Sequence, residues 1–340
     1  MRRAAAAAVL FVVLGIPPGT SAAPTDRIWF CPGPGTIDYI SLFEHPEQWP
    51  HARELFDVFK FYQQHTQTPS ADVVGPNSYD ALVRAAAFQT LTKWGKKIAI
   101  EAGAVKEFYC TPDASGMQQA IGNTLDSIGA VQRAGGAVSY IAMDEPFVSG
   151  RAAVCGGPAL EPTADRVATY VKAVTGSVGG TRVGLIEAYP FSSEPALESI
   201  LGLLDARGVP PAFLHVDVDS RALRPGRDDF TRDMRALRQA CASHSIPFGI
   251  IVWGYNGDSD VLYAMDAGHV VDEITNAFTT WSDMPDQVIV QSWAVSSTGQ
   301  SITPANLPET QPYTHTNLLW DEIRRLRGQN GASSGTAIRR

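Results

Sequence analysis

Five short apolar runs in this 340-residue chain end in a carboxylate or a tryptophan, and stretches with helical spacing separate them. These runs span residues 97–101, 140–145, 183–187, 213–219 and 248–253. Near-continuous apolar runs are typical of parallel strands that are buried on both faces. In a (β/α)8 barrel the functional groups lie where the strands end, so the pattern indicates both a fold and the floor of a candidate site.

Predicted strands and predicted helices alternate eight times along the chain. The predicted strands span residues 27–30, 55–62, 97–101, 139–144, 182–187, 212–217, 247–253 and 287–293. The helical stretches begin near Ser, Thr, Asp or Asn and mostly stop at Gly. They span residues 79–94, 115–134, 164–174, 194–206, 228–243, 258–281 (with an interruption expected at Gly268) and 314–326. Alternating βα units predict a parallel sheet, and eight of them favour a single (β/α)8 TIM barrel of class α/β.

An open, doubly wound sheet of eight strands is the alternative architecture. A phosphate-binding G-x-G-x-x-G segment after the first strand would support it. The chain has Cys31-Pro-Gly-Pro-Gly35 at that place, which is stiffened by proline and is not followed at once by a helix.

The two ends of the chain are not expected to belong to the fold. Arg2 and Arg3 precede an apolar stretch at residues 4–16 and small residues at 20–23, which predicts a cleaved signal peptide over residues 1–23. The apolar stretch is about 13 residues long, shorter than the ~20 that span a bilayer. We therefore expect a secreted or periplasmic protein with a barrel domain at 24–328. A tail at 329–340 is expected to be disordered.

The charge of the chain limits which partners it can bind. The formal net charge is -8 and no segment concentrates basic residues, so nucleic acid and anionic membrane surfaces are poor partners. We expect a monomer without stable membrane insertion. The four cysteines permit disulfides after export. The expected strand order favours Cys110 with Cys155, leaves Cys241 as a buried free thiol, and lets Cys31 compete for either loop cysteine.

Asp144-Glu145-Pro146 follows the predicted strand at 139–144. A Glu at a strand end that a following Pro fixes can point into a cleft whose apolar neighbours raise its pKa, which suits a general acid. The alternative for Glu145 is a helix cap or a loop carboxylate paired with an arginine.

Two short motifs resemble those of the large clan A of barrel glycoside hydrolases. Ala142-Met-Asp-Glu-Pro146 resembles the clan's Asn-Glu-Pro, and Gln291-Ser-Trp293 resembles its substrate-stacking tryptophan. The resemblance implies that Glu145 is the acid/base. Asp144 stands where the clan has Asn, and the strand at 247–253 lacks the clan's nucleophilic Glu. The adjacent Asp-Glu also resembles the barrel N-acetylhexosaminidases, in which the Glu is the acid and the Asp orients the substrate's acetamide.

A second catalytic carboxylate is expected from another strand. Glu187 on the neighbouring strand is the first candidate, and Asp217, Asp219 and Glu101 follow. Each of them could instead be a structural carboxylate. The distance between the second carboxyl group and that of Glu145 would decide the stereochemistry at the anomeric carbon. A distance of about 5 Å predicts retention, and about 6.5–9.5 Å predicts inversion.

Further residues are expected to bind substrate. Lys60 interrupts an apolar strand, and a buried lysine needs a partner. It is expected to meet a carboxylate, either to bind sugar hydroxyls or as a structural pair with Glu101. Trp253, Trp293 and Tyr189 lie near strand ends, where aromatic faces can stack on a pyranose. Asp144, Glu101, Asp217 and Asp219 are expected to bind hydroxyls when they are not catalytic.

These features predict an exported glycoside hydrolase that cleaves a poly- or oligosaccharide by carboxylate catalysis, without a cofactor. One alternative is a barrel that binds carbohydrate without cleaving it, in polysaccharide export or recognition. Another is a metal-assisted hydrolase or lyase, because Asp and Glu could hold Mg²⁺ or Ca²⁺, although no spacing of ligands predicts a metal site.

Overall fold

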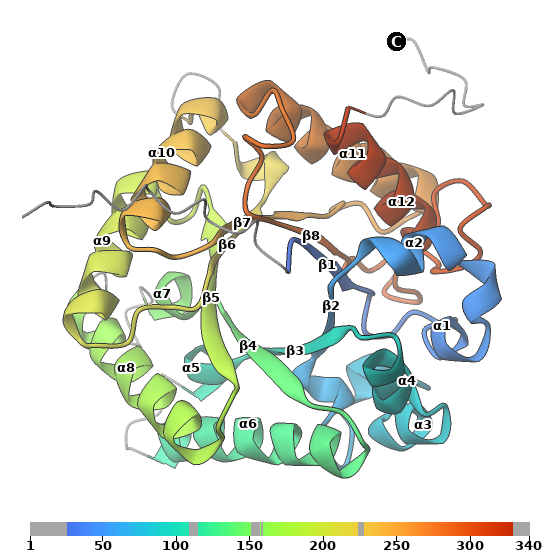
Figure 1. Ribbon diagram of the computed structural model, residues 1–340, viewed down its shortest axis with the longest axis horizontal. Helices are drawn as coiled ribbons and strands as arrows, with labels where there is room; N and C mark the ends of the chain where they lie inside the picture. Colours follow the sequence, from blue (N-terminus) through green and yellow to red (C-terminus); the bar gives the residue numbers. More distant parts are fainter. Residues whose placement is uncertain (1–25, 109–114, 151–156, 158, 224–227, 329–340) are drawn as a thin grey trace, which may run out of the picture.

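The computed structural model describes residues 26–328, apart from 109–114, 151–156, 158 and 224–227. Eight parallel strands close into a barrel in chain order, and β1 pairs with both β2 and β8 (Figure 1). The strands are β1 (Ile28–Cys31), β2 (Val58–Tyr62), β3 (Lys97–Ala102), β4 (Val138–Asp144), β5 (Arg182–Tyr189), β6 (Leu214–Val218), β7 (Phe248–Val252) and β8 (Gln287–Gln291). The (β/α)8 prediction is confirmed, and closure of β1 on β8 excludes the open sheet.

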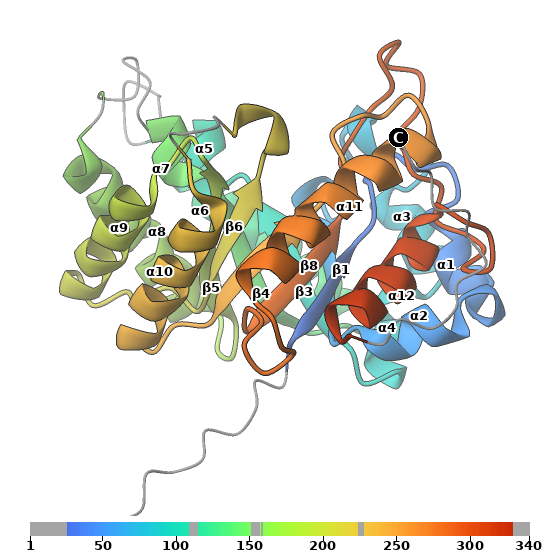
Figure 2. The ribbon, with the colours of Figure 1, turned by 90° about the horizontal axis from the view of Figure 1, so that it is seen from above.

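The helices form a ring outside the barrel (Figure 1). They are α1 (Ser41–Glu44), α2 (Pro50–Leu55), α3 (Tyr79–Arg84), α4 (Ala87–Lys93), α5 (Ala104–Phe108), α6 (Ser115–Arg133), α7 (Pro146–Gly150), α8 (Leu160–Ser177), α9 (Glu194–Ala206), α10 (Phe230–Ser243), α11 (Asp260–Ala277) and α12 (His315–Leu326). The short helices α5 and α7 follow β3 and β4 and lie on the face where these strands end, whereas the longer helices pack along the strands (Figure 2).

Several elements differ from the sequence prediction by a few residues, and three differences have a local cause. The helix expected at 79–94 is two helices, because Ala86 adopts a left-handed conformation with φ of 51°. The strand expected from residue 55 begins at Val58, because Leu55 still belongs to the helix that Pro50 opens. No interruption occurs at Gly268, since α11 buries Ala267, Val270 and Val271 against the barrel and this packing outweighs one glycine's low helix propensity.

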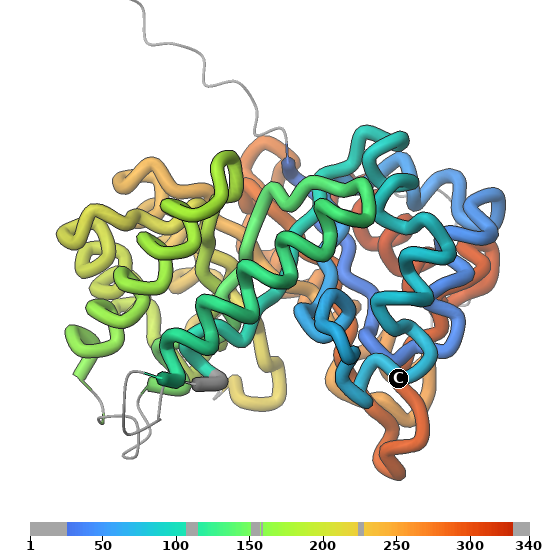
Figure 3. Tube along the Cα trace, turned by 90° about the horizontal axis from the view of Figure 1, so that it is seen from below, coloured from blue at the N-terminus to red at the C-terminus, as the bar shows by residue number. Residues whose placement is uncertain are grey.

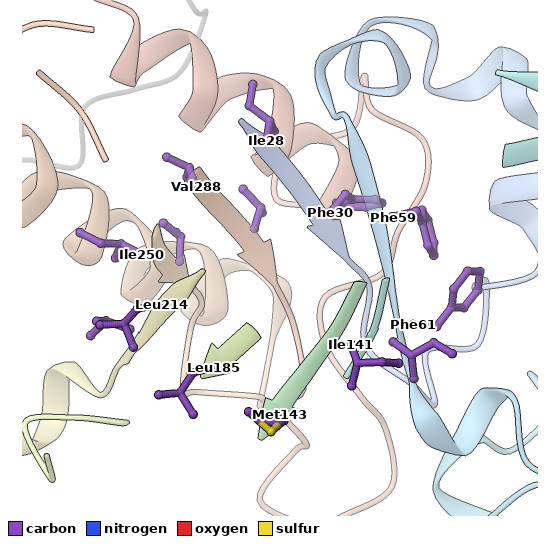
Figure 4. Close-up of a cluster of buried hydrophobic side chains, with 14 of the residues drawn as sticks. Ile28, Phe30, Phe59, Phe61, Ile141, Met143, Leu185, Leu214, Ile250 and Val288 are labelled. Carbon is purple, nitrogen blue, oxygen red and sulfur yellow. The ribbon is translucent and has the colours of Figure 1, made fainter. Parts of the chain in front are cut away.

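Alternate residues of each strand point to opposite sides of the barrel wall. One set lies under the helices and forms the larger core; Figure 4 labels several of its members, among them Phe30, Phe59 and Leu185. The other set fills the barrel, where the ring of Trp29 lies 5.0 Å from that of Tyr140 and 5.1 Å from that of Phe213 between centroids. The barrel is therefore a packed core at this level and not a channel.

Several expectations fall on residues that the structure does not describe. They include the signal peptide, the tail at 329–340, and the Cys110–Cys155 pair. Cys241 is a buried free thiol, as predicted, and Cys31 is also free and buried, so it does not compete for a partner. Within the described ranges, no helix has the length and apolar character needed to cross a membrane.

Candidate active site

The inward-facing residues change from apolar to polar where the strands end. Lys60, Glu101, Asp144, Asp217 and Gln291 share the inward side of their strands with the apolar filling of the barrel. A pocket of about 350 Å³ opens above them. Its charged lining consists of Glu101, Lys106, Asp144, Glu145 and Asp217. The closed barrel thus gathers four carboxyl groups from β3, β4 and β6 at one site.

Lys60 and Glu101 form an ion pair beneath the pocket. The Lys60 ammonium is fully buried and donates to the Glu101 carboxylate and to the side-chain oxygen of Gln291. Burial opposes the charge on Lys60, but the neighbouring Glu101 outweighs it and raises the pKa of the ammonium. Glu101 and Gln291 line the pocket and Lys60 does not. Lys60 therefore influences the pocket by holding these two side chains. This ion pair is the contact between Lys60 and a carboxylate that the sequence predicted.

Lys106 joins the two carboxylates that follow β4. Its ammonium donates to Asp144 Oδ2 at 2.7 Å and to Glu145 Oε2 at 3.1 Å. Consecutive strand residues would point to opposite sides, but Glu145 adopts a left-handed conformation with φ of 45°, and both side chains line the pocket. A non-glycine residue in this region stores strain, which is common at functional sites.

The sequence reasoning missed Lys106. A signal was present, because Lys106 is the first charged residue after Ala102-Gly-Ala-Val105, in the segment that follows the strand with Glu101. The pKa of Lys106 is raised, since the charges of Asp144 and Glu145 outweigh its partial burial. The pKa of Glu145 is also raised, first by burial and then by repulsion from Asp144, while Lys106 opposes the rise.

Asp217 has a different environment from the other three carboxyl groups. It lies on β6, and its Oδ1 atom is buried without a hydrogen-bond partner among the described residues. Burial raises the pKa of Asp217 to about 8, with further contributions from Glu145, Glu101 and Asp144 and an opposing one from Lys60. This shift favours the protonated form of the Asp217 carboxyl at neutral pH.

Glu187 lies on the other side of the barrel wall from the pocket. It shares the outward side of β5 with Val183 and Leu185, which belong to the core under the helices. Its two oxygens accept hydrogen bonds from the backbone N–H groups of Phe147 at 2.7 Å and Val148 at 3.0 Å, at the start of α7. Burial raises its pKa to about 8 against these two bonds. The structure therefore does not bring Glu187 and Glu145 together in one pocket.

Tyr189 and Asp219 also lie away from the pocket lining. Tyr189 is on the outward side of β5, and its hydroxyl donates to Asp233 at 2.7 Å. Asp219 follows β6, where it forms an ion pair with Arg221 at 2.8 Å and accepts from the Arg221 backbone N–H.

The two predicted tryptophans lie together at the ends of β7 and β8. Trp253 is buried, and its ring lies 4.6 Å from that of Trp293 between centroids. Trp293 is 42% exposed and lines the pocket, as does Tyr62, whose hydroxyl donates to the Ser292 carbonyl at 2.8 Å. Trp293 can therefore offer a face to a ligand, with Trp253 supporting it from behind.

No cluster of three or more His, Cys, Asp or Glu side chains within the described ranges is arranged to hold a metal ion. Instead, Glu101 pairs with Lys60, and Asp144 and Glu145 pair with Lys106. Burial favours the neutral form of Asp217.

No family model and no curated protein matches the sequence. Solved structures match the fold. An endo-β1,6-glucanase is 11% identical with a TM-score of 0.57, and the alignment covers 89% of this chain and 78% of that one. A thermostable mutant of a xylanase from Cellvibrio japonicus is 10% identical with a TM-score of 0.56, over 90% and 98% of the two chains.

The fold is also shared with an enzyme of another class. D-psicose 3-epimerase from Clostridium cellulolyticum H10 is 11% identical with a TM-score of 0.51, over 88% of this chain and 98% of that one. At such low identity these matches establish the TIM-barrel fold alone. One fold carries many chemistries, so the activity has to be argued from the site.

Glu187→Gln should lower the free energy of unfolding by about 1–3 kcal/mol, because the amide NH2 group would face a backbone N–H that needs an acceptor. Chemical denaturation of the purified variant measures this loss. Glu198→Gln on the exposed side of α9 is the matched control and should leave stability unchanged. Equal stability of both variants would contradict a structural role for Glu187.

Proposed function

We propose that this protein is a glycoside hydrolase in which Asp217 and Glu145 are the two catalytic carboxyl groups. The observation that carries the proposal is that both carboxyl groups line one pocket in unlike environments. Asp217 contacts no cation among the described residues, whereas Glu145 accepts from the Lys106 ammonium. Environments that push two carboxyl pKa values apart are the usual basis of acid and base roles. The fold shared with a glucanase and a xylanase is compatible with this chemistry.

In this proposal Asp217 carries the proton. Its pKa of about 8 keeps it protonated at neutral pH, so it can donate to the glycosidic oxygen. Glu145 contacts an ammonium, which favours its ionised form against burial and Asp144. This assignment reverses the role that the sequence suggested for Glu145 and replaces Glu187 with Asp217 as its partner.

The reaction then follows the two-carboxyl scheme. The bond between the anomeric carbon and the glycosidic oxygen breaks, and that oxygen takes the proton of Asp217. In one route Glu145 attacks the anomeric carbon and forms a glycosyl-enzyme; water then breaks that ester bond and gives its proton back to Asp217. In the other route Glu145 removes a proton from the water that attacks the anomeric carbon. Asp144 and Glu101 can accept hydrogen bonds from sugar hydroxyls, Gln291 can also donate them, and Trp293 can stack on the sugar.

A barrel that binds carbohydrate without cleaving it is the second candidate. The observation in its favour is that Lys106 already neutralises Asp144 and Glu145, as in a structural ion pair.

Export through a signal peptide at residues 1–23 also stays a proposal.

Leaving-group dependence separates the two catalytic roles. A panel of oligosaccharides and of aryl glycosides is followed by release of reducing ends or phenol. Asp217→Asn should lose about 10²–10⁴-fold in kcat/KM on oligosaccharides, the usual contribution of a general acid, yet keep most activity on dinitrophenyl glycosides, whose leaving group needs no proton. Glu145→Gln should lose activity on both, and Asp219→Asn on neither.

The opposite pattern, with Glu145→Gln rescued by the activated substrates, would return the acid role to Glu145. Saturable binding of a glycan by the wild type, with no cleavage of any substrate, would instead favour the binding barrel.

The pH profile tests the role of Lys106. Activity of the wild type should fall as pH rises through about 8, where Asp217 loses its proton, and should fall at low pH as Glu145 gains one. Lys106→Met removes a cation that favours ionised Glu145, so the acidic limb of kcat/KM should move to higher pH. An acidic limb that stays in place would mean that Lys106 does not act on the catalytic base.

A further inference from the structure

The pocket has a second wall of a different chemical character. This wall is mostly apolar and consists of the side chains of Pro34, Val73, Trp293, Val295 and Ile302. They come from the segments after β1, β2 and β8, whereas the charged side chains come from β3, β4 and β6 and the segments that follow them. Figures 2 and 3 show the loop after β8 and the helices α5 and α7 on different sides of this face of the barrel.

Close backbone packing fixes this apolar wall. A Cβ on Gly33 would lie 2.6 Å from Ile302 Cγ2, and one on Gly35 would lie 2.6 Å from the Val73 carbonyl and 2.7 Å from Ile302 Cδ1. The Pro-Gly-Pro-Gly segment after β1 thus lets three loops meet. Val295 and Ile302 pair as an antiparallel bridge that Ser296 N supports by donating to the Ser301 carbonyl at 2.9 Å. The wall is therefore formed before any ligand arrives.

The wall leaves apolar surface exposed to solvent. Val73 is 47% exposed, Trp293 42% and Val295 52%. The valine, isoleucine and proline side chains offer no hydrogen bond to a sugar hydroxyl, so a sugar placed on them would lose its bonds to water without replacement. Apolar surface beside a pocket of polar groups usually marks a binding site for an apolar group. Tyr62 and Gln64 also line the pocket and add polar groups beside this wall.

We propose that the apolar wall is the subsite for the leaving group, and that the substrate is a glycoside with an alkyl aglycone, the chemistry of a glycolipid. This inference rests on the proposed function. The sugar lies against the carboxyl groups and Trp293, and the alkyl chain runs over Val73, Val295 and Ile302. One pocket holds both walls, so a single molecule with a sugar and an alkyl part can contact the two walls at once.

A chain-length series tests the proposal. Methyl, butyl, hexyl and octyl glycosides of glucose, galactose and mannose, in both anomers, are assayed for release of the sugar. Burial of one methylene is worth about 0.8 kcal/mol, so kcat/KM should rise by up to about fourfold per methylene until the wall is covered. Calorimetric titration of methyl and octyl glucoside gives a binding readout that does not depend on turnover.

The double variant Val73→Thr with Val295→Thr replaces exposed methyl groups by hydroxyls of the same shape. It should weaken binding and turnover of the octyl glycoside by roughly threefold to tenfold and leave the methyl glycoside unchanged. Val83→Thr is the matched control, since Val83 is a valine of similar exposure (42%) on α3 that does not line the pocket, and it should change neither.

The outcomes separate this inference from the proposed function. Cleavage with no dependence on chain length, or an equal effect of the control variant, would overturn the alkyl subsite and leave the hydrolase intact. Octyl glucoside that binds more tightly than methyl glucoside, with no cleavage of these glycosides or of the oligosaccharide and aryl glycoside panel, would support an alkyl subsite and overturn the hydrolase. No binding and no cleavage of the alkyl series, with cleavage of the oligosaccharide panel, would overturn the alkyl subsite alone, and no cleavage of either panel without binding would overturn both.

Discussion

The chemistry of this molecule depends on how a closed barrel accommodates charge. Closure points every second strand residue inward, and at the strand ends these residues include Lys60, Glu101, Asp144 and Asp217. Buried charges are tolerated when they are paired or neutralised. Lys60 pairs with Glu101, and Lys106 holds Asp144 and Glu145. No lysine or arginine of the described residues contacts Asp217, and burial raises the pKa of its carboxyl. The carboxyl groups therefore differ because some contact a lysine and Asp217 does not.

The same closure brings together two unlike walls. The segments after β8, β1 and β2 are neighbours around the barrel and carry proline, valine, isoleucine and tryptophan, whereas β3, β4 and β6 end in charge. The glycines at 33 and 35 allow three loops to meet closely enough to make a continuous apolar surface. A ligand that satisfies both walls has a polar, hydrogen-bonding part and an apolar part, and this links the proposed reaction to the proposed kind of aglycone.

Much of the fold could be predicted from sequence, because apolar runs and helix caps repeat with the βα period. Strand ends also predicted Asp144, Glu145, Glu101 and Asp217 as pocket residues. The choice of Glu187 did not use the two-residue period of its strand, which puts it on the same side as Val183 and Leu185, toward the helices. The left-handed turn at Glu145 and the contact that Lys106 makes depend on tertiary packing, so no local pattern could have predicted them.

The protonation state of Asp217 is the most direct test of this account. Aspartate labelled with ¹³C at the side-chain carboxyl carbon can be titrated by NMR in the wild type and in Asp217→Asn, and the difference between the two assigns the Asp217 signal. We expect a midpoint near a pKa of about 8, because burial of the carboxyl disfavours its charge. A midpoint below about 5, in the ordinary range of aspartate, would mean that Asp217 is ionised at neutral pH and cannot be the acid.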